Sequence, residues 1–93
     1  MPAGGLLVLK NYCAITFPNT HCALQAEKVL QAIPTVPFMI MPVPNMISAG
    51  CGLAVKTTLE VHPEVLQVLN DAAVLFDGVY SVDREKGLVY RIV

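Results

Sequence analysis

The sequence predicts an α+β protein with a ferredoxin-like β-α-β-β-α-β order and an additional C-terminal strand. Two observations lead to this fold class. Short stretches rich in β-branched and aromatic residues alternate with two longer stretches whose apolar residues follow the helical period. Prolines or glycines close most of these stretches. We therefore expect an antiparallel sheet with two helices on one face.

The first half of the chain supplies two strands and one helix. Residues 12–17 are rich in β-forming side chains and predict a strand. The Pro-Asn-Thr sequence that follows ends the strand and offers capping side chains for a helix over residues 20–32. Residues 38–41 predict a short buried strand, which a Pro-Val-Pro sequence closes. Residues 45–52 are then expected to form a loop.

The second half repeats this order and adds a strand. Residues 53–58 predict the third strand, and His62 opens a second helix with a proline in its first turn. A fourth strand is expected at residues 78–82. The sequence at residues 84–87 is typical of a hairpin loop, which returns the chain into a last strand at residues 88–93.

Residues 1–93 are expected to form a single domain, with residues 1–10 as an extra strand or an ordered tail. Hydrophobic residues make up 55% of the chain and charged residues only 14%. Such a small domain cannot bury so much apolar surface by itself. We expect the second face of the sheet to stay open unless a partner covers it, and we expect a homo-oligomer.

Composition also excludes several classes of function. The six basic residues are scattered and form no stripe for nucleic acid. No apolar run is long enough for a membrane span or a signal peptide. Three cysteines without a C-x-x-C pair fit free thiols in a reducing, cytoplasmic compartment. Paired carboxylates, a phosphate-binding glycine loop and a catalytic triad are missing, so we expect no cofactor and no conventional enzyme.

The expected topology brings distant residues to one end of the sheet. The start of the first helix, the loop at residues 45–52 and the entry to the fourth strand near Asp77 would meet there. His21 and Cys51 would then be neighbours, whereas His62 would lie at the opposite end. The positive N-terminus of the helix would favour a thiolate at Cys51.

The run from Ser48 to Gly52 holds the strongest candidate for chemistry, which is Cys51. Gly50 and Gly52 would allow a tight backbone and expose the sulfur to a partner. Ser48 can donate a hydrogen bond, and His21 can supply a proton or a charge.

Other interpretations of the cysteines stay open. A Gly-Cys-Gly run can equally be a tight connection that contains a small apolar residue. Cys13 lies in the middle of a strand and Cys22 on the apolar helix face, so core packing is favoured for both. A zinc or copper(I) site of His21, Cys22 and Cys51 is conceivable, but the missing C-x-x-C pair weakens it and we expect no metal. A non-catalytic ferredoxin-like module that oligomerises or binds a small ligand is the alternative function.

Four short motifs occur in a specific order, at residues 16–23, 26–30, 40–44 and 47–54. Their sharpest parts are Thr20-His21 at the helix start and Ser48-x-x-Cys51-Gly52 after the Pro-x-Pro sequence. In this combination the chain resembles the Se/S carrier protein-like family of small bacterial domains.

The resemblance implies a carrier of sulfur or selenium. Cys51 would accept a sulfane sulfur or selenium as a persulfide or perselenide and pass it on, with Thr20, His21 and Ser48 as its neighbours. The implied partners are a cysteine desulfurase or a protein of selenophosphate synthesis. The chain has Asn45-Met46 and Ala49-Gly50 where the family usually carries charged residues or serines.

Overall fold

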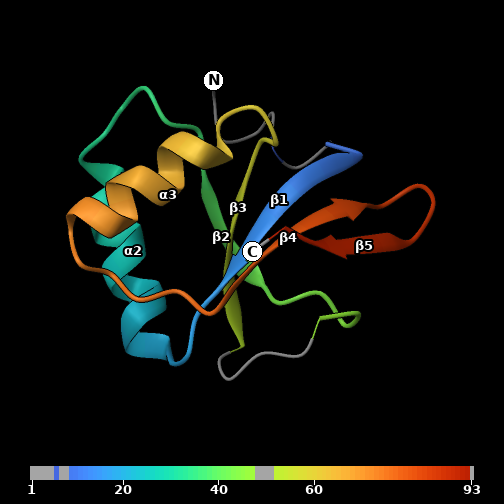
Figure 1. Cartoon of the computed structure of the whole chain (residues 1–93), viewed down its shortest axis with the longest axis horizontal. Helices are drawn as coiled ribbons and strands as arrows, with labels where there is room; N and C mark the ends of the chain where they lie inside the picture. The colour runs from blue at the N-terminus through green and yellow to red at the C-terminus, as the bar shows by residue number, and fades with distance from the viewer. Residues whose placement is uncertain (1–5, 7–8, 48–51, 93) are drawn as a thin grey trace.

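The computed structural model describes residues 6, 9–47 and 52–92. In chain order its elements are β1 (Asn11–Thr16), α2 (Thr20–Gln31), β2 (Met39–Pro42), β3 (Leu53–Thr57), α3 (His62–Asp71), β4 (Gly78–Asp83) and β5 (Leu88–Arg91). The strands form one sheet in the order β2-β3-β1-β4-β5, with every neighbouring pair antiparallel (Figure 1). The α+β class, the two helices and the additional C-terminal strand are confirmed.

Local signals in the sequence account for the start of each helix. Asn19 is the N-cap of α2, with an extended backbone, and its Oδ1 accepts a hydrogen bond of 2.9 Å from the N–H of Cys22. Helix α3 has a proline in its first turn, where no backbone donor is needed. The expected boundaries of α2 agree with the structure to one residue. Neither helix in the described part of the chain is long and apolar enough to cross a bilayer.

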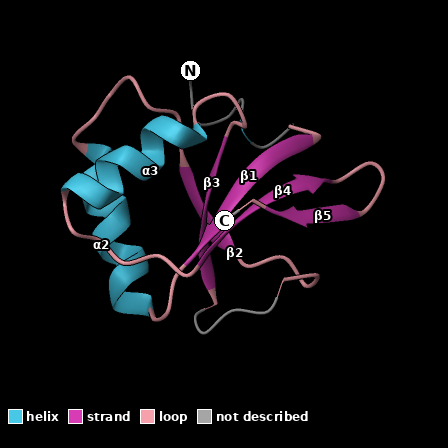
Figure 2. Cartoon of the chain, in the orientation of Figure 1, coloured by secondary structure: helices cyan, strands magenta, loops and turns pink. Residues whose placement is uncertain are grey.

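The main hydrophobic core lies between the sheet and the two helices, which share one side of the sheet in Figure 2. Cys13 and Ile15 of β1 point into this core and are fully buried. They meet Ala26 and Leu30 of α2 and Leu69 of α3 within the same cluster. The helical period of these residues therefore reflects burial against the sheet.

The second face of the sheet is less open than expected, and this prediction was wrong in part. A smaller cluster on this face contains Tyr12, Ala14 and Val82, which are at most 5% exposed. Ile47, from the connection between β2 and β3, completes the cluster, and Leu9 packs against it. Side chains of the chain's own loops therefore cover part of the surface that a partner was expected to cover.

The segment before β1 is partly packed. Leu6 is fully buried, and its carbonyl accepts a hydrogen bond of 3.4 Å from the N–H of Leu9. The described residues of this segment, at positions 6, 9 and 10, belong to no strand. Of the two expectations for residues 1–10, the extra strand is therefore not seen at these positions.

Candidate functional site

Strand register brings the predicted site segments to one end of the sheet, here called the Thr16 end. Thr16, the last residue of β1, is paired with Ala54 of β3 on one side and with Gly78 of β4 on the other. The last residue of β2, Pro42, is paired with Leu53, the first residue of β3. The start of α2 therefore lies at the same end as the connection between β2 and β3 (Figure 1).

The first turn of α2 presents polar groups at the Thr16 end. Thr20 and His21 are both exposed there, next to the N-cap Asn19. No acidic residue stands in this first turn. The partial positive charge of the helix N-terminus is therefore not offset locally, and it favours a nearby anion such as a thiolate.

The connection between β2 and β3 is anchored at both of its ends. The N–H of Val43 donates a hydrogen bond of 3.0 Å to the carbonyl of Gly52, and the N–H of Ile47 donates one of 2.9 Å to that of Pro44. The side chain of Ile47 is buried in the second cluster. These contacts hold the ends of the connection at the Thr16 end. The predicted residues Ser48, Gly50 and Cys51 lie outside the described residues.

Gly52 does not need to be glycine for lack of space. It is exposed, and a Cβ added there would meet no described atom within 4 Å. The described surroundings therefore place no steric requirement on this position. A substitution at Gly52 would be accommodated by the described surroundings.

The two described cysteines are core residues, as the sequence patterns favoured. Cys13 is fully buried in the middle of β1, and burial raises the pKa of its thiol to about 12. Cys22 is 7% exposed and belongs to the core between the sheet and the helices. A thiol enclosed in the core cannot reach a donor or an acceptor, and the raised pKa of Cys13 also makes its thiol a poor nucleophile. Of the three cysteines, neither Cys13 nor Cys22 is suited to exchange atoms with a partner.

The predicted residues are brought together only in part. Thr20, His21 and Gly52 share the Thr16 end, but no described hydrogen bond joins the side chain of Thr20 or of His21 to Gly52.

His62 lies at the opposite end of the sheet, as expected. Its Nδ1 lies 2.6 Å from the carbonyl oxygen of Leu59, so it closes the turn before α3. Within residues 6, 9–47 and 52–92, no three His, Cys, Asp or Glu side chains gather in a group that could hold a metal.

The second face of the sheet holds a buried cation that sequence patterns did not single out. Lys56 of β3 is 5% exposed, and its Nζ lies 4.4 Å from the ring centroid of Tyr12. Burial, and then the positive charge of Arg84, lower the pKa of Lys56. The sequence did contain a sign of this buried lysine. Side chains alternate between the two faces of β3, so Lys56 had to lie on the same face of the sheet as Ala54.

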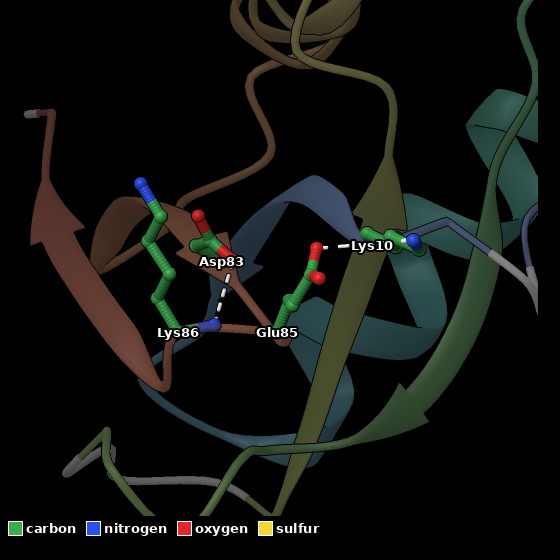
Figure 3. A network of polar contacts seen from close by, with 4 residues as sticks. All are labelled: Lys10, Asp83, Glu85 and Lys86. Carbon is green, nitrogen blue, oxygen red and sulfur yellow. Dashed lines mark hydrogen bonds and ion pairs between the residues drawn. The ribbon is translucent and has the colours of Figure 1, made fainter.

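A shallow cavity of about 390 Å³ lies near the turn between β4 and β5, lined by Leu9, Lys10, Arg84 and Glu85. Lys10 and Glu85 form an ion pair of 3.8 Å beside it (Figure 3). Both side chains are about 70% exposed, so this pair contributes little to stability. The cavity is open to solvent and lies away from the Thr16 end.

A family model described as "Putative Se/S carrier protein-like" matches residues 12–81. The match covers about three quarters of the chain and spans β1 through most of β4. No curated protein and no solved structure matches the chain.

Proposed function

The chain belongs to the Se/S carrier protein-like family, and from this premise we propose that it carries sulfur or selenium on Cys51. The thiolate of Cys51 accepts a sulfane sulfur or a selenium atom and holds it as a persulfide or perselenide. A second protein or a small nucleophile then takes the atom. The protein is a carrier in this proposal rather than a conventional enzyme.

The burial of the other two thiols is the observation that carries the proposal. A carrier needs a thiolate that a donor protein can reach. The chain has three cysteines, and Cys13 and Cys22 are enclosed in the core. Cys51 is the one thiol that this packing leaves for transfer chemistry.

The anchored ends of the β2–β3 connection add support. Val43 and Gly52 are joined by a hydrogen bond at the Thr16 end, where α2 also begins. In the proposal, the N-terminus of α2 favours the thiolate form of Cys51, with Thr20 and His21 of the first turn close by. Ser48 donates a hydrogen bond to the loaded sulfur, and Gly50 and Gly52 leave the approach open.

Each transfer step is balanced without an external oxidant or reductant. The Cys51 thiolate attacks the terminal sulfur of a donor persulfide, a new S–S bond forms, and the donor cysteine leaves as a thiolate. In delivery, an acceptor nucleophile attacks the terminal sulfur, the S–S bond breaks, and Cys51 leaves as a thiolate. The same steps apply to selenium. A cysteine desulfurase fits the donor role, and a protein of selenophosphate synthesis fits the acceptor role in a reducing cytoplasm.

Persulfide formation tests the proposal. The full chain is incubated with a cysteine desulfurase and free cysteine, and mass spectrometry locates the added sulfur atom. We expect it on Cys51, with no loading of a Cys51→Ser variant and full loading of the matched Cys22→Ser control. Equal loading of Cys13 or Cys22, or no loading of the native chain, contradicts the proposal.

A non-catalytic module is the second candidate, and exposed apolar side chains on β5 favour it. We interpret β1 to β4 with the two helices as a ferredoxin-like core, and β5 as a fifth strand added to the sheet next to β4. Such a module would act through binding alone. It predicts that Cys51→Ser leaves every partner interaction unchanged, whereas the carrier proposal predicts the loss of transfer.

A further inference from the structure

The last strand of the sheet carries a row of exposed apolar side chains. Leu88, Tyr90 and Ile92 are 41%, 61% and 42% exposed, and we call them the β5 strip. Leu88 and Tyr90 belong to β5 and Ile92 follows its last residue, and because the three alternate along the extended chain, they share one face. Tyr90 is paired with Ser81, and the N–H of Ile92 donates a 2.7 Å hydrogen bond to the carbonyl of Val79.

The helices do not cover the β5 strip. Val79 belongs to the core beneath the helices, so the strip lies on the helix side of the sheet. Figures 1 and 2 show that the hairpin of β4 and β5 extends away from α2 and α3. The three residues expose on the order of 300 Å² of surface, which is the lower end of the size of the largest apolar patch on a typical monomer, a patch that is often functional.

The two edges of the sheet differ in their protection. At the β2 edge, Pro42 lies within the strand and Pro37 and Pro44 flank it, so backbone donors are missing there. Strand β5 contains no proline. The N–H of Ile92 bonds to the carbonyl of Val79 on β4. In an antiparallel pair, the backbone groups of successive residues point alternately toward and away from the partner strand. The N–H and C=O of Val89 therefore point away from β4. In the described part of the chain, no strand lies on that side of β5.

We propose that two copies of this chain pair antiparallel through β5, with Tyr90 facing Tyr90 of the second copy at the two-fold axis. Leu88 then faces Ile92 of the second copy, and the two β5 strips form one continuous apolar surface. Val89 faces Arg91 of the second copy on the other side of the sheet. The pairing joins the two sheets into one across the molecular boundary.

Charge selects this register. A shift of two residues toward the C-terminus would place Arg91 opposite Arg91 of the second copy, which like charges disfavour. A shift in the other direction would keep Leu88 opposite Tyr90 of the second copy, but it would place Ile92 opposite Lys86 of the turn, so Ile92 would lose its apolar partner. The Arg91 side chain lies away from the strip, where its Nη2 donates to the Asp77 carbonyl at 3.3 Å and its guanidinium lies 5.7 Å from the Tyr80 ring centroid.

The area sets the expected strength. Two strips bury on the order of 600 Å² of apolar surface, and stable dimers bury roughly 1,200–2,000 Å² in total. Main-chain pairing adds to the apolar contact but does not make the interface large. We expect a reversible dimer with a dissociation constant on the order of tens of micromolar.

Sedimentation velocity of the full chain over a concentration series tests this dimer. Tyr90→Lys places two ammonium groups in contact at the axis, and we expect at least a tenfold weaker dimer. The matched control is Leu24→Lys, because Leu24 is 50% exposed on α2 and lies outside the strip. The control should dimerise as the native chain does, and circular dichroism should show both variants folded. A native chain that stays monomeric at several hundred micromolar (about ten times the expected dissociation constant), or two variants that dimerise equally, overturns the proposal.

A disulfide trap tests the register independently. Facing residues in a non-hydrogen-bonded antiparallel pair have Cα atoms about 4.5 Å apart, within the range of a disulfide. Tyr90→Cys in a Cys51→Ser background should therefore cross-link two copies under mild oxidation, whereas Leu24→Cys in that background should not. Equal cross-linking of the two variants contradicts the register. Cys51→Ser alone should dimerise normally, which separates this inference from the carrier function.

Discussion

Thr16 and Gly78 are joined by two hydrogen bonds, although they lie 62 positions apart in the chain. The Oγ1 of Thr16 accepts from the N–H of Gly78 at 3.0 Å and donates to its carbonyl at 3.4 Å. A further bond of 2.7 Å runs from the N–H of Asp77 to the Thr16 carbonyl. One fully buried hydroxyl therefore joins the end of β1 to the entry of β4, next to the start of α2.

Thr16→Val keeps the shape of this side chain and removes its hydroxyl. The N–H of Gly78 then has no partner in a buried position, so we expect a loss of about 1–3 kcal/mol in the free energy of unfolding. Urea denaturation measures it. Thr20→Val is the control, because Thr20 is exposed, and it should change stability by less than about 0.5 kcal/mol. Equal effects of the two variants would show that the Thr16 hydroxyl has no special role.

Asn19→Ala removes the N-cap of α2. Because the N–H of Cys22 loses its acceptor at 2.9 Å, the free energy of unfolding should fall by about 1 kcal/mol. Thermal denaturation followed by circular dichroism at the helical band measures the change. Asn45→Ala, at an exposed position outside the helices, is the control and should melt as the native chain does. An unchanged melting temperature for Asn19→Ala would contradict the capping role.

Ionisation of the Cys13 thiol should lower the free energy of unfolding at alkaline pH. Burial raises the pKa of its thiol from 9.0 to about 12, so the folded state holds this proton more tightly than the unfolded state does. Its contribution is complete below pH 9 and is lost as the pH rises toward 12. We expect the free energy of unfolding to fall with a slope of up to about 1.4 kcal/mol per pH unit in this range.

Comparison with Cys13→Val isolates this effect by urea denaturation at a series of alkaline pH values. Lys56 has a lowered pKa and acts in the opposite direction, but it is present in both proteins and cancels in the difference. The stability gap between the native chain and the variant should change with pH through this range. A constant gap would mean that the Cys13 proton is not linked to folding.

Lys56→Met should raise stability at neutral pH. Lys56 is 5% exposed as a residue, and the contact of its ammonium with the Tyr12 ring does not prevent a lowered pKa. Methionine keeps the length of the side chain without the cost of burying a charge. We expect a gain of up to about 1 kcal/mol in the free energy of unfolding, since the loss of the cation–π contact offsets part of the benefit.

Lys10→Met is the control for Lys56→Met. Lys10 is exposed and its ion pair with Glu85 is weak, so its replacement should change stability by less than about 0.5 kcal/mol. Urea denaturation of both variants at pH 7 gives the comparison. A loss of stability in Lys56→Met would mean that the ring contact outweighs the burial of the charge.

Local chemistry made most of the elements predictable. The side chain of Asn19 and the helical spacing that follows it set the start of α2, and both signals lie within a few residues of each other. The proline in the first turn of α3 acts in the same way. The family motifs around Cys51 are also linear, so the candidate residue needed no structure to be named.

Contacts between distant residues were not predictable in the same way. The second face of the sheet was expected to be open, but Ile47 and Leu9 reach it from outside the strands. The open surroundings of Gly52, where an added Cβ would meet no described atom within 4 Å, were not predictable either. Each of these outcomes depends on where a loop lies in space, and no periodicity encodes that position.

The sequence by itself determined the order of the elements, the caps and the identity of the candidate cysteine, because these depend on neighbours along the chain. Only the tertiary structure decided how far the pKa of the Cys13 thiol is raised, that Lys56 is a buried cation, and that β5 is an edge with exposed apolar side chains. The reason is physical: burial and strand pairing arise when segments far apart in sequence come together, and they set both the pKa of a thiol and the surface left for a partner.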